Sequence, residues 1–388
     1  MNILMLISAP IPSCEGIVPH VLGLGKQLRQ RGHEVTLMTR GGMKGQEEIN
    51  HEGFSIIKVP FLPLYPLHVI MHRYNVLRAL DNLKFKPDIV HLHTPLVPYL
   101  PKKWPLVTTF HTPMLSDTAS VEDYGIRSRL IKIIGKTTSF WVEKELLRNS
   151  DCIITVSYAV ADELRKYYHY EGDNLFPILN AVDTSFFKPG TPAESSPYLL
   201  YIGRMDFRKG LFDLIASARI VADKFREVSY YLVGNGPLEE PLKKAVKEAG
   251  LGKNIKFCGV VHDRQTILKY YQEARAIIIP SHYEGLPMVM IEAMACGKPL
   301  ICTNASFSKG ILEDGKNALL VNPKSPAELA AATIRLLSDD KLCRDLGVAA
   351  RKTAEAKFGA EVQADQVLEV YRLARERFKQ LSKIECRE

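Results

Sequence analysis

Short apolar runs alternate with longer amphipathic stretches along almost the whole of this chain of 388 residues. The apolar runs are typical of buried strands, and the stretches between them repeat their apolar residues at helical spacing. Strands that alternate with helices build βαβ units with parallel sheets, so the sequence predicts an α/β fold. Strands are expected at 3–8, 34–38, 89–92, 106–110, 152–156, 198–202, 228–233, 255–257, 277–280 and 300–303, and helices at 20–31, 69–83, 127–148, 158–168, 210–224, 238–249, 266–274, 288–296, 326–337 and within 339–382.

A polar interval rich in Pro, Gly and Ser, at 188–197, separates two regions of this alternation. Such an interval is typical of a linker between domains. We therefore expect two doubly wound domains, at 1–190 and 191–360, followed by a C-terminal helical segment at 361–388. Ligands of such domains bind outside the carboxyl ends of the strands, so functional residues are sought in the turns that follow strands.

Composition narrows the class of protein. With 46% apolar and 24% charged residues, the chain is expected to be globular and neither disordered nor fibrous. Its seven cysteines include no Cys-x-x-Cys pair, which indicates reduced thiols in a cytoplasmic protein and makes a zinc site unexpected. The apolar N-terminus has no basic region of a signal peptide, and no apolar stretch is long enough for a spanning helix, so we expect a soluble or peripheral protein.

The net charge of +8 is not gathered in one block, so a nucleic-acid partner is not indicated. A mildly basic surface, an anionic substrate and an anionic membrane surface all remain compatible with it. Two segments would suit a membrane: basic and apolar residues interleave at 127–136, and 61–68 is apolar and rich in Pro. A packed helix with a solvated basic face is the simpler interpretation of 127–136, and a loop that bridges two elements is an alternative for 61–68.

Two glycine-containing turns lie between a strand and a helix in the second half. The first, Gly203-Arg204 to Lys209-Gly210, places two cations before a helix N-terminus, where backbone N–H groups and the helix dipole also favour an anion. This arrangement suits a diphosphate, although a solvated turn with ordinary surface cations is an alternative. The second turn contains Gly234, where a glycine permits close approach of a ligand or simply a tight turn.

A third junction carries two carboxylates. Glu284 precedes a predicted helix that Pro287 would begin, and Glu292 lies in its second turn among apolar residues. A carboxylate accepts two hydrogen bonds side by side, which matches the vicinal hydroxyls of a sugar or a ribose. A helix-dipole acid together with an ion pair at the edge of the core is the alternative interpretation.

Several histidines end strands of the first half. His91 and His93 alternate on one predicted strand and so share a face, which raises the question of a metal, but no third ligand is apparent nearby. Structural or acceptor-lining roles are therefore favoured. His111 lies just past another predicted strand and, taken alone, is also interpreted as structural.

The spacing of Glu284 and Glu292 within Glu-Gly-Leu-Pro and Glu-Ala-Met-Ala-Cys-Gly-Lys-Pro resembles the signature of retaining glycosyltransferases of family four, the glycosyl transferases group 1. The turns at 203–210 and 233–237 and the segments at 31–35 and 180–189 are similar to other motifs of that family, in the same order from 1 to about 358. The resemblance implies the GT-B fold, in which two Rossmann-like domains face a cleft and a last helix crosses back to the first domain.

The resemblance also implies a role for each residue. Glu284 would hold hydroxyls of the donor sugar, Glu292 the ribose hydroxyls, and Arg204 and Lys209 the diphosphate. His111 would lie near the carbon-six hydroxyl of the sugar. The full set implied is catalytic His111, Arg204, Lys209 and Glu284, with Gly16, Gly203, Gly234, Gly285, Leu286 and Glu292 as donor-binding residues.

The mechanism that the resemblance implies is retaining, with a donor phosphate oxygen as the base. The chain contains no Asp-x-Asp motif of the metal-dependent transferases, so no metal ligand and no cofactor beyond the donor substrate are expected. Three positions depart from the family pattern: Glu15 replaces the first of two glycines, Ala181 replaces a glycine, and a Gly-Gly turn is absent at 305–310. These departures bear on the contacts of the diphosphate.

The sequence thus predicts hexosyl transfer from a nucleotide-diphosphate sugar, such as a UDP- or GDP-sugar, to a hydroxyl of a sugar or lipid acceptor. Peripheral association with the inner face of a membrane is an additional possibility that the lipid-modifying members of the family suggest. The alternatives are a sugar phosphorylase or epimerase of the same fold, or a catalytically weak, basic protein that binds a membrane surface.

Overall fold

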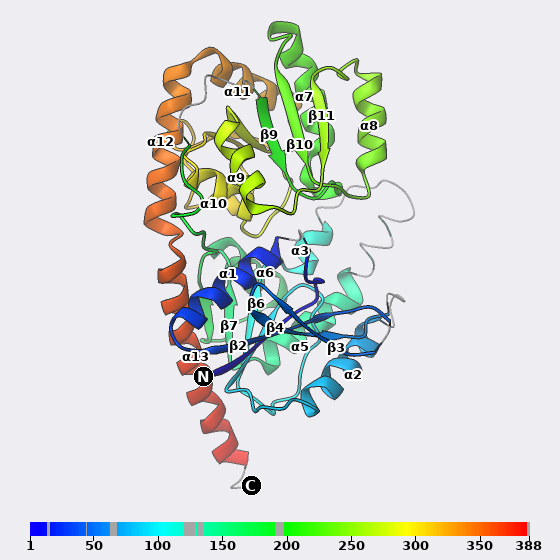
Figure 1. The fold of residues 1–388 in the computed structure, drawn as a ribbon, viewed down its shortest axis with the longest axis vertical. Coiled ribbons are helices and arrows are strands. Elements are labelled where there is room, and N and C mark those ends of the chain that lie inside the picture. The colour runs from blue at the N-terminus through cyan, green and yellow to red at the C-terminus, as the bar shows by residue number, and fades with distance from the viewer. Residues whose placement is uncertain are drawn as a thin grey trace. The chain divides into compact units, whose positions relative to one another are not determined.

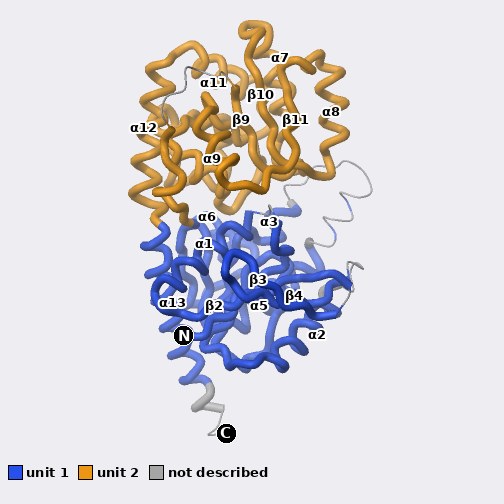
Figure 2. The backbone as a smooth tube through the Cα atoms, in the orientation of Figure 1, with its two compact units in different colours: residues 1–180, 360–388 blue, residues 181–359 orange. Residues whose placement is uncertain are grey.

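The computed structural model describes the chain except for residues 14–15, 44, 63–67, 120–128, 130–132, 134, 191–197 and 386–388. Glu15, most of the apolar segment at 61–68, most of the basic stretch at 127–136 and the greater part of the predicted linker therefore lie outside the described residues. The chain forms two compact units, unit 1 with Met1–Asn180 and Ala360–Glu388 and unit 2 with Ala181–Gly359 (Figure 2).

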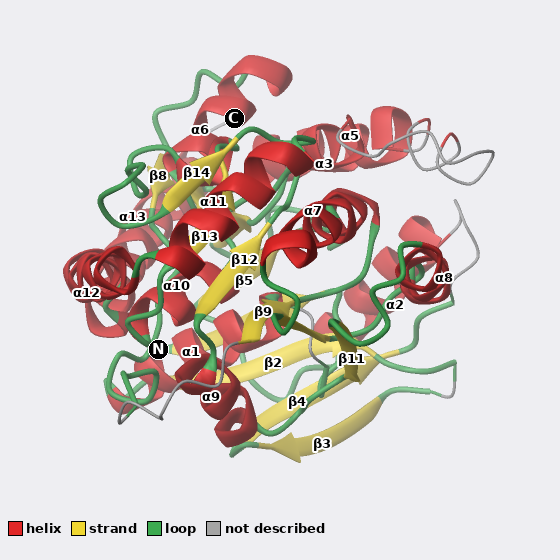
Figure 3. Cartoon of the chain, turned by 90° about the horizontal axis from the view of Figure 1, so that it is seen from above, coloured by secondary structure: helices red, strands yellow, loops and turns green. Residues whose placement is uncertain are grey.

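Unit 1 is built on an eight-stranded sheet in the order β3-β4-β2-β1-β5-β6-β7-β8. All neighbouring strands are parallel except β3, which runs antiparallel to β4 (Figure 3). Its elements are β1 (Asn2–Ile7), α1 (Ile17–Gln30), β2 (Glu34–Arg40), β3 (Glu47–His51), β4 (Phe54–Val59), α2 (His68–Asp81), β5 (Ile89–His93), β6 (Leu106–Phe110), α3 (Met114–Ala119), the π-helical turn η1 (Gly135–Ser139), α5 (Phe140–Asn149), β7 (Cys152–Thr155), α6 (Tyr158–Tyr168), β8 (Leu175–Pro177) and α13 (Ala360–Glu385).

Unit 2 is built on a six-stranded sheet in the order β11-β10-β9-β12-β13-β14, with every pair parallel. Its strands β9, β10 and β11 are labelled in Figure 1. Its elements are β9 (Tyr198–Ile202), the 3₁₀ turn η2 (Phe207–Lys209), α7 (Leu211–Lys224), β10 (Ser229–Val233), α8 (Glu239–Glu248), β11 (Ile255–Gly259), α9 (Arg264–Glu273), β12 (Ala276–Ile279), α10 (Met288–Ala295), β13 (Leu300–Thr303), the 3₁₀ turn η3 (Ser306–Ser308), β14 (Leu319–Val321), α11 (Pro326–Ser338) and α12 (Asp340–Lys357).

Both sheets have a point at which the strand order reverses. In unit 1 the chain leaves β1 toward β2 and later returns to the other side of β1 with β5. In unit 2 the chain leaves β9 toward β10 and β11 and returns beside β9 with β12. The turns after the two strands at such a point diverge, which opens a crevice at the carboxyl edge where ligands of doubly wound folds bind.

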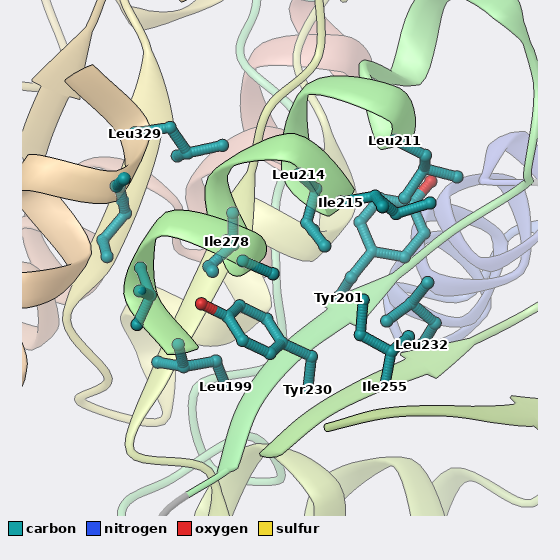
Figure 4. Close-up of a cluster of buried hydrophobic side chains, with 14 of the residues drawn as sticks. Leu199, Tyr201, Leu211, Leu214, Ile215, Tyr230, Leu232, Ile255, Ile278 and Leu329 are labelled. Atoms are coloured by element: carbon teal, nitrogen blue, oxygen red, sulfur yellow. The ribbon is translucent and has the colours of Figure 1, made fainter. Parts of the chain in front are cut away.

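The two cores explain why the chain divides as it does. In unit 2, Leu211, Leu214 and Ile215 of α7 lie over Tyr201 and Tyr230 of the sheet (Figure 4). In unit 1, the C-terminal helix α13 contributes to the core that forms around β1 and β2, and the α13 residues that do so are Ala364, Val367, Val370, Tyr371 and Ala374. The C-terminal helix therefore belongs to the N-terminal unit.

The boundary between the units precedes the predicted one. The structure divides the chain after Asn180, whereas the sequence places the division in the segment 188–197. The residues between belong to unit 2 because the Arg351 guanidinium donates hydrogen bonds to the carbonyls of Thr184 and Phe187, and the Phe187 ring packs edge-on against Tyr271.

The predicted strands are all present, and most predicted helices match to within two residues. The expected cap of the helix that follows β7 is confirmed, because the Ser157 hydroxyl accepts the Val160 N–H at 3.2 Å. Pro287 is the N-cap of α10, and the helix begins one residue later. No helix in the described part of the chain combines the length and the apolar character needed to cross a bilayer.

Candidate active site

Three neighbouring strands of unit 2 bring the predicted donor-site turns to one edge of the sheet. β9 lies between β10 and β12, and all three run in the same direction. The turns that follow them contain Gly203 to Lys209, Gly234, and Glu284 to Leu286, respectively. The parallel topology therefore gathers these residues from segments that are far apart in the sequence.

The first two turns pack backbone against backbone. Gly203 N–H donates to the Val233 carbonyl at 3.0 Å, and Met205 N–H donates to the Asn235 carbonyl at 2.8 Å. A Cβ on Gly234 would lie 2.0 Å from the Gly203 carbonyl oxygen, and the Gly234 backbone has a φ of +128°. Only glycine fits at this position, so the predicted turn needs Gly234 for its own packing, whatever ligand it also approaches.

The turn after β9 is also tied to the turn after β12. Its 3₁₀ segment is capped by Asp206, whose carboxylate accepts the Arg208 N–H at 3.2 Å. The Arg208 carbonyl in turn accepts the His282 N–H at 2.7 Å. Gly210 has a φ of +64°, and a Cβ there would lie 2.0 Å from the Pro280 carbonyl oxygen. The cation-bearing loop is thus held against the carboxylate-bearing loop by main-chain contacts.

Lys209 and Glu284 form an ion pair between these loops. The Lys209 ammonium donates to Glu284 Oε1, and the Ser281 hydroxyl donates to the same oxygen at 3.0 Å. Glu284 is buried. Burial alone would raise the pKa of this carboxyl, but the charges of Lys209 and Arg208 and the two hydrogen bonds outweigh it and lower the pKa. Glu284 is therefore an ionised acceptor with one oxygen engaged by the protein.

Arg204 differs from Lys209 in its surroundings. Its side chain is exposed, and its guanidinium has no hydrogen-bond or ion-pair partner among the described residues. The main chain of Arg204 is nevertheless held in place, because its carbonyl accepts the Tyr201 hydroxyl at 2.9 Å. A positioned backbone that carries an unpaired guanidinium suits the binding of an external anion.

Glu292 lies one helical turn inside α10. Its Oε2 accepts the Tyr271 hydroxyl at 2.8 Å. Burial of the carboxyl raises the pKa of Glu292 to about 7, although the hydrogen bond from Tyr271 and the charge of Arg264 act in the opposite direction. Gly285 and Leu286 are buried in the turn between Glu284 and the start of α10.

The two predicted site residues of unit 1 lie at the carboxyl edge of its own sheet. Gly16 is exposed immediately before α1, and among the described residues nothing lies within 4 Å of a Cβ built on it. His111 follows β6, its N–H donates to Thr94 Oγ1 at 3.3 Å, and its Nε2 lies 3.3 Å from Nδ1 of His93. Burial, and then the neighbouring His20 and His91, lower the pKa of His111 well below 6.5, so its imidazole is neutral.

Four groups near these sites were not predicted. Ser281 and Tyr271 hold the two carboxylates, His282 Nε2 lies 2.7 Å from Asp213 Oδ2 beside the cation-bearing loop, and His20 of α1 lies beside His111 with ring centroids 4.8 Å apart. Ser281 and His282 could have been found from the sequence, because they are polar residues that directly precede Glu284 in the turn after a predicted strand. The roles of Tyr271 and His20 depend on contacts between distant segments, which no local spacing indicates.

Comparison with known proteins supports the resemblance. The family model described as Glycosyl transferases group 1 matches residues 182–353, and the model described as Glycosyltransferase Family 4 matches residues 15–186. A relative, glycogen synthase of Mycobacterium tuberculosis, is 27% identical over 383 residues, which cover 93% of this chain and 91% of the relative.

Solved structures show the same fold. Sucrose-phosphate synthase of Thermosynechococcus elongatus has a TM-score of 0.80 at 24% identity and covers 96% of this chain and 98% of its own. HepE of Anabaena, solved in complex with UDP-glucose, has a TM-score of 0.72 at 18% identity and covers 95% of this chain and 98% of its own. The predicted fold class, two Rossmann-like α/β domains of the GT-B type, is confirmed.

The contact between Gly234 and Gly203 yields a stability prediction. In Gly234→Ala the added Cβ must push the turns after β9 and β10 apart, whereas Gly250→Ala, at a φ of +71° with open space around it, adds only backbone strain. That strain alone costs about 1–2 kcal/mol. We expect Gly234→Ala to lower the melting temperature, followed by far-UV circular dichroism, by several degrees more than Gly250→Ala, at about 2–4 °C per kcal/mol. Equal losses in the two variants would contradict the close packing of these turns.

Proposed function

The chain belongs to the glycosyl transferases group 1, and on this premise we propose that it transfers a hexosyl group from a UDP- or GDP-sugar to an acceptor hydroxyl with retention of anomeric configuration. The observation that carries the proposal is the Lys209–Glu284 pair at the strand-order reversal of unit 2, together with Arg204 of the same turn, whose guanidinium has no partner among the described residues. A sugar diphosphate presents an anion next to vicinal hydroxyls, and this edge presents cations next to a carboxylate.

The pair can bind a donor without being broken. An ammonium has three N–H donors, so Lys209 can keep its bond to Glu284 and donate to a phosphate oxygen at the same time. Ser281 and Lys209 both donate to Oε1 of Glu284, which leaves Oε2 as the acceptor for a sugar hydroxyl. Arg204 adds a second cation to the diphosphate.

The proposed reaction breaks the bond between the anomeric carbon and the diphosphate oxygen. Negative charge develops on that oxygen, and Lys209 and Arg204 stabilise it as the bond breaks. The acceptor oxygen forms the new bond on the same face, and its proton passes to a phosphate oxygen of the leaving nucleoside diphosphate. Because the side-chain cations supply the charge at the diphosphate, the proposed transfer requires neither a divalent ion nor a cofactor.

The relatives support a nucleotide sugar as the donor and do not narrow the acceptor to one chemical class. HepE is solved with UDP-glucose, which favours a uridine nucleotide for this chain. The Mycobacterium tuberculosis relative is a glycogen synthase, so a sugar hydroxyl is a reasonable acceptor, and a lipid-linked one is considered below. For Gly16 and His111 we keep the roles that the resemblance implies, N–H groups at the diphosphate and a hydrogen bond to the carbon-six hydroxyl.

Replacement of Glu284 tests the proposed activity. Glu284→Gln keeps the size of the side chain but removes its negative charge. That charge pairs with Lys209 and strengthens the hydrogen bond that the carboxylate accepts from the sugar hydroxyl. We expect hydrolysis of UDP-glucose or GDP-mannose, and transfer to an added sugar, to fall by about 100-fold. The matched control is Glu313→Gln, which breaks the exposed pair of Glu313 with Lys316 and should leave activity unchanged.

Nucleoside diphosphate release is measured by coupled assay at a temperature below the melting transition of both variants. Full activity in Glu284→Gln would show that the Glu284 carboxylate is not needed for the transfer and would contradict its assignment to the site. The anomeric configuration of the product, followed by proton NMR, decides between retention and inversion. Turnover that needs inorganic phosphate, or an epimerised donor without acceptor, would instead identify a phosphorylase or an epimerase.

The raised pKa of Glu292 predicts a pH-dependent affinity for the donor. Ribose hydroxyls are bound best by the ionised carboxylate, and Glu292 loses its proton only as the pH rises through about 7. We therefore expect the affinity for UDP-glucose to rise between about pH 6 and pH 8, by at most about tenfold per unit. Isothermal titration measures it, since the diphosphate of UDP-glucose does not itself titrate near neutral pH. Glu292→Gln should flatten the profile, and an unchanged slope in that variant would assign the dependence to another group.

We further propose that the acceptor is carried at a membrane surface. Exposed aromatic and aliphatic side chains of α2 and α5 are joined into one patch, because the Arg73 guanidinium lies 4.2 Å from the centroid of the Tyr99 ring, which contacts Trp141 edge-on at 5.2 Å. Its exposed members include Ile70, Tyr74 and Trp141. Lys136 and Lys144 are exposed on and just before α5, and such a mixture of apolar and basic groups suits the inner, anionic face of a membrane.

Vesicle flotation tests this surface. We expect the protein to float with vesicles of phosphatidylcholine and phosphatidylglycerol and to remain in solution with phosphatidylcholine alone. Trp141→Glu should abolish flotation, because it puts an anion into the patch. Val348→Glu, at a similarly exposed apolar residue of α12 in unit 2, should float like the parent. Equal flotation of the two variants would assign membrane contact to another surface.

A further inference from the structure

Three histidines of unit 1 gather at the carboxyl edge of its sheet. His20 lies in α1, His93 is the last residue of β5, and His111 follows β6. One ring nitrogen from each of the three lies within 4.8 Å of the others. His20 and His93 are buried, and His111 is partly buried. This grouping differs from the one that the sequence suggests, which pairs His93 with His91.

The hydrogen bonds of these imidazoles separate His91 from the others. Both ring nitrogens of His91 are engaged at 2.7 Å, one with the Tyr371 hydroxyl and one with the Thr109 hydroxyl. In contrast, Nδ1 of His20 and Nε2 of His93 are buried and have no hydrogen-bond partner among the described residues. A buried polar atom without a partner costs free energy and calls for an explanation. His91 is therefore structural. The unpaired nitrogen of His93 is Nε2 and not the Nδ1 that faces His111, so it is Nδ1 of His20 whose lack of a partner the fold alone does not explain.

The spacing of the nitrogens fits a metal. Nδ1 of His93 and Nε2 of His111 are 3.3 Å apart. With Zn–N bonds of about 2.0–2.1 Å, two ligands of a tetrahedral zinc ion lie roughly 3.4 Å from each other. The three nitrogens lie within 4.8 Å of one another, so the His20 nitrogen must move closer by up to about 1.4 Å to reach that ligand spacing, which rotation of a side chain near the start of α1 can supply. Because the same 3.3 Å also fits a hydrogen bond between the two imidazoles, the spacing alone does not decide.

The protonation state is the one a metal requires. Burial lowers the pKa of His20 to about 4 and, together with the neighbouring imidazoles, lowers the pKa of His93 well below 6.5. Neutral imidazoles keep a lone pair on one nitrogen, so a divalent ion does not have to displace a proton at neutral pH.

We propose that His20, His93 and His111 form a binding site for Zn²⁺, with a fourth coordination position left open to solvent. Imidazole donors without a carboxylate select late divalent ions such as Zn²⁺ and Co²⁺ over Mg²⁺. The ion is not a cofactor of the proposed transfer, in which Arg204 and Lys209 supply the charge. Resting on that proposed function, bound Zn²⁺ withholds His111 from the donor sugar and so inhibits transfer reversibly.

Metal binding is tested without any activity measurement. The full chain, free of affinity tags and treated with EDTA, is titrated with Co²⁺ while its visible absorption is followed, and Zn²⁺ is then added as competitor. We expect one equivalent of Co²⁺ with the intense visible bands of a tetrahedral ion, displaced by one equivalent of Zn²⁺. Loss of one ligand in His20→Gln should weaken binding by more than the roughly 10–100-fold that loss of an outer-shell partner costs.

The matched control is His169→Asn, which replaces an exposed histidine in the left-handed conformation by a residue that tolerates it. It should bind Co²⁺ like the parent. If His20→Gln does not fold, as judged by circular dichroism, His111→Gln at the partly exposed position carries the test. An unchanged affinity in the folded ligand variant, or an octahedral spectrum in the parent, would leave only a hydrogen-bonded pair and overturn the proposal.

Inhibition is measured separately, so that the two proposals fail separately. Micromolar Zn²⁺ should lower donor turnover and EDTA should restore it. Tight Zn²⁺ binding by these histidines with full turnover would keep the metal site and reject the role of His111 in the transfer. Absence of any turnover, with binding intact, would reject the proposed function alone.

Discussion

The Lys209–Glu284 ion pair is the interaction on which the candidate site depends. Both side chains are removed from most of the solvent, and charges in such a position are stable only when they are paired and hydrogen-bonded. The pair and the main-chain bonds beside it lock the turn after β9 to the turn after β12 across the strand-order reversal. Removal of one partner from a buried pair costs about 3–5 kcal/mol, which explains why function and local stability are hard to separate here.

The same edge shows why glycines and charges occur together. For the Gly203 and Gly234 backbones to touch, Gly234 cannot carry a side chain, because its Cβ would meet the Gly203 carbonyl oxygen; a Cβ on Gly203 would instead meet the Tyr201 hydroxyl at 3.0 Å. Their close approach places the cation-bearing loop after β9 directly against the turn after β10 at the carboxyl edge of the sheet. The proposed diphosphate can approach this edge only where the backbone does not project side chains into its path. The glycine turns thus shape the site, and Arg204 and Lys209 give it charge.

The sequence predicted much of this and missed the rest for identifiable physical reasons. Strands such as β9 and β12 are continuous apolar runs because both faces of a parallel sheet are buried. β8 and β14 are too short to show a period, and β3 is polar because it lies at the edge; β4 has a readable alternation that the prediction overlooked. The carboxylates were predicted from their spacing, whereas Tyr271 and Ser281 hold them through contacts that only the folded chain creates.

The histidines of unit 1 show most clearly what sequence spacing alone does not predict about side-chain contacts. His91 and His93 lie on one face of their strand, so the sequence presents them as a pair, yet their contacts differ. Both ring nitrogens of His91 are hydrogen-bonded, and His93 faces His111, which follows β6. What brings His20 to them is the packing of α1 against β2 and α13, a relation with no fixed sequence spacing. Burial then keeps these imidazoles neutral. A neutral imidazole can donate to a sugar hydroxyl or bind a late divalent ion, and the two uses exclude each other at His111.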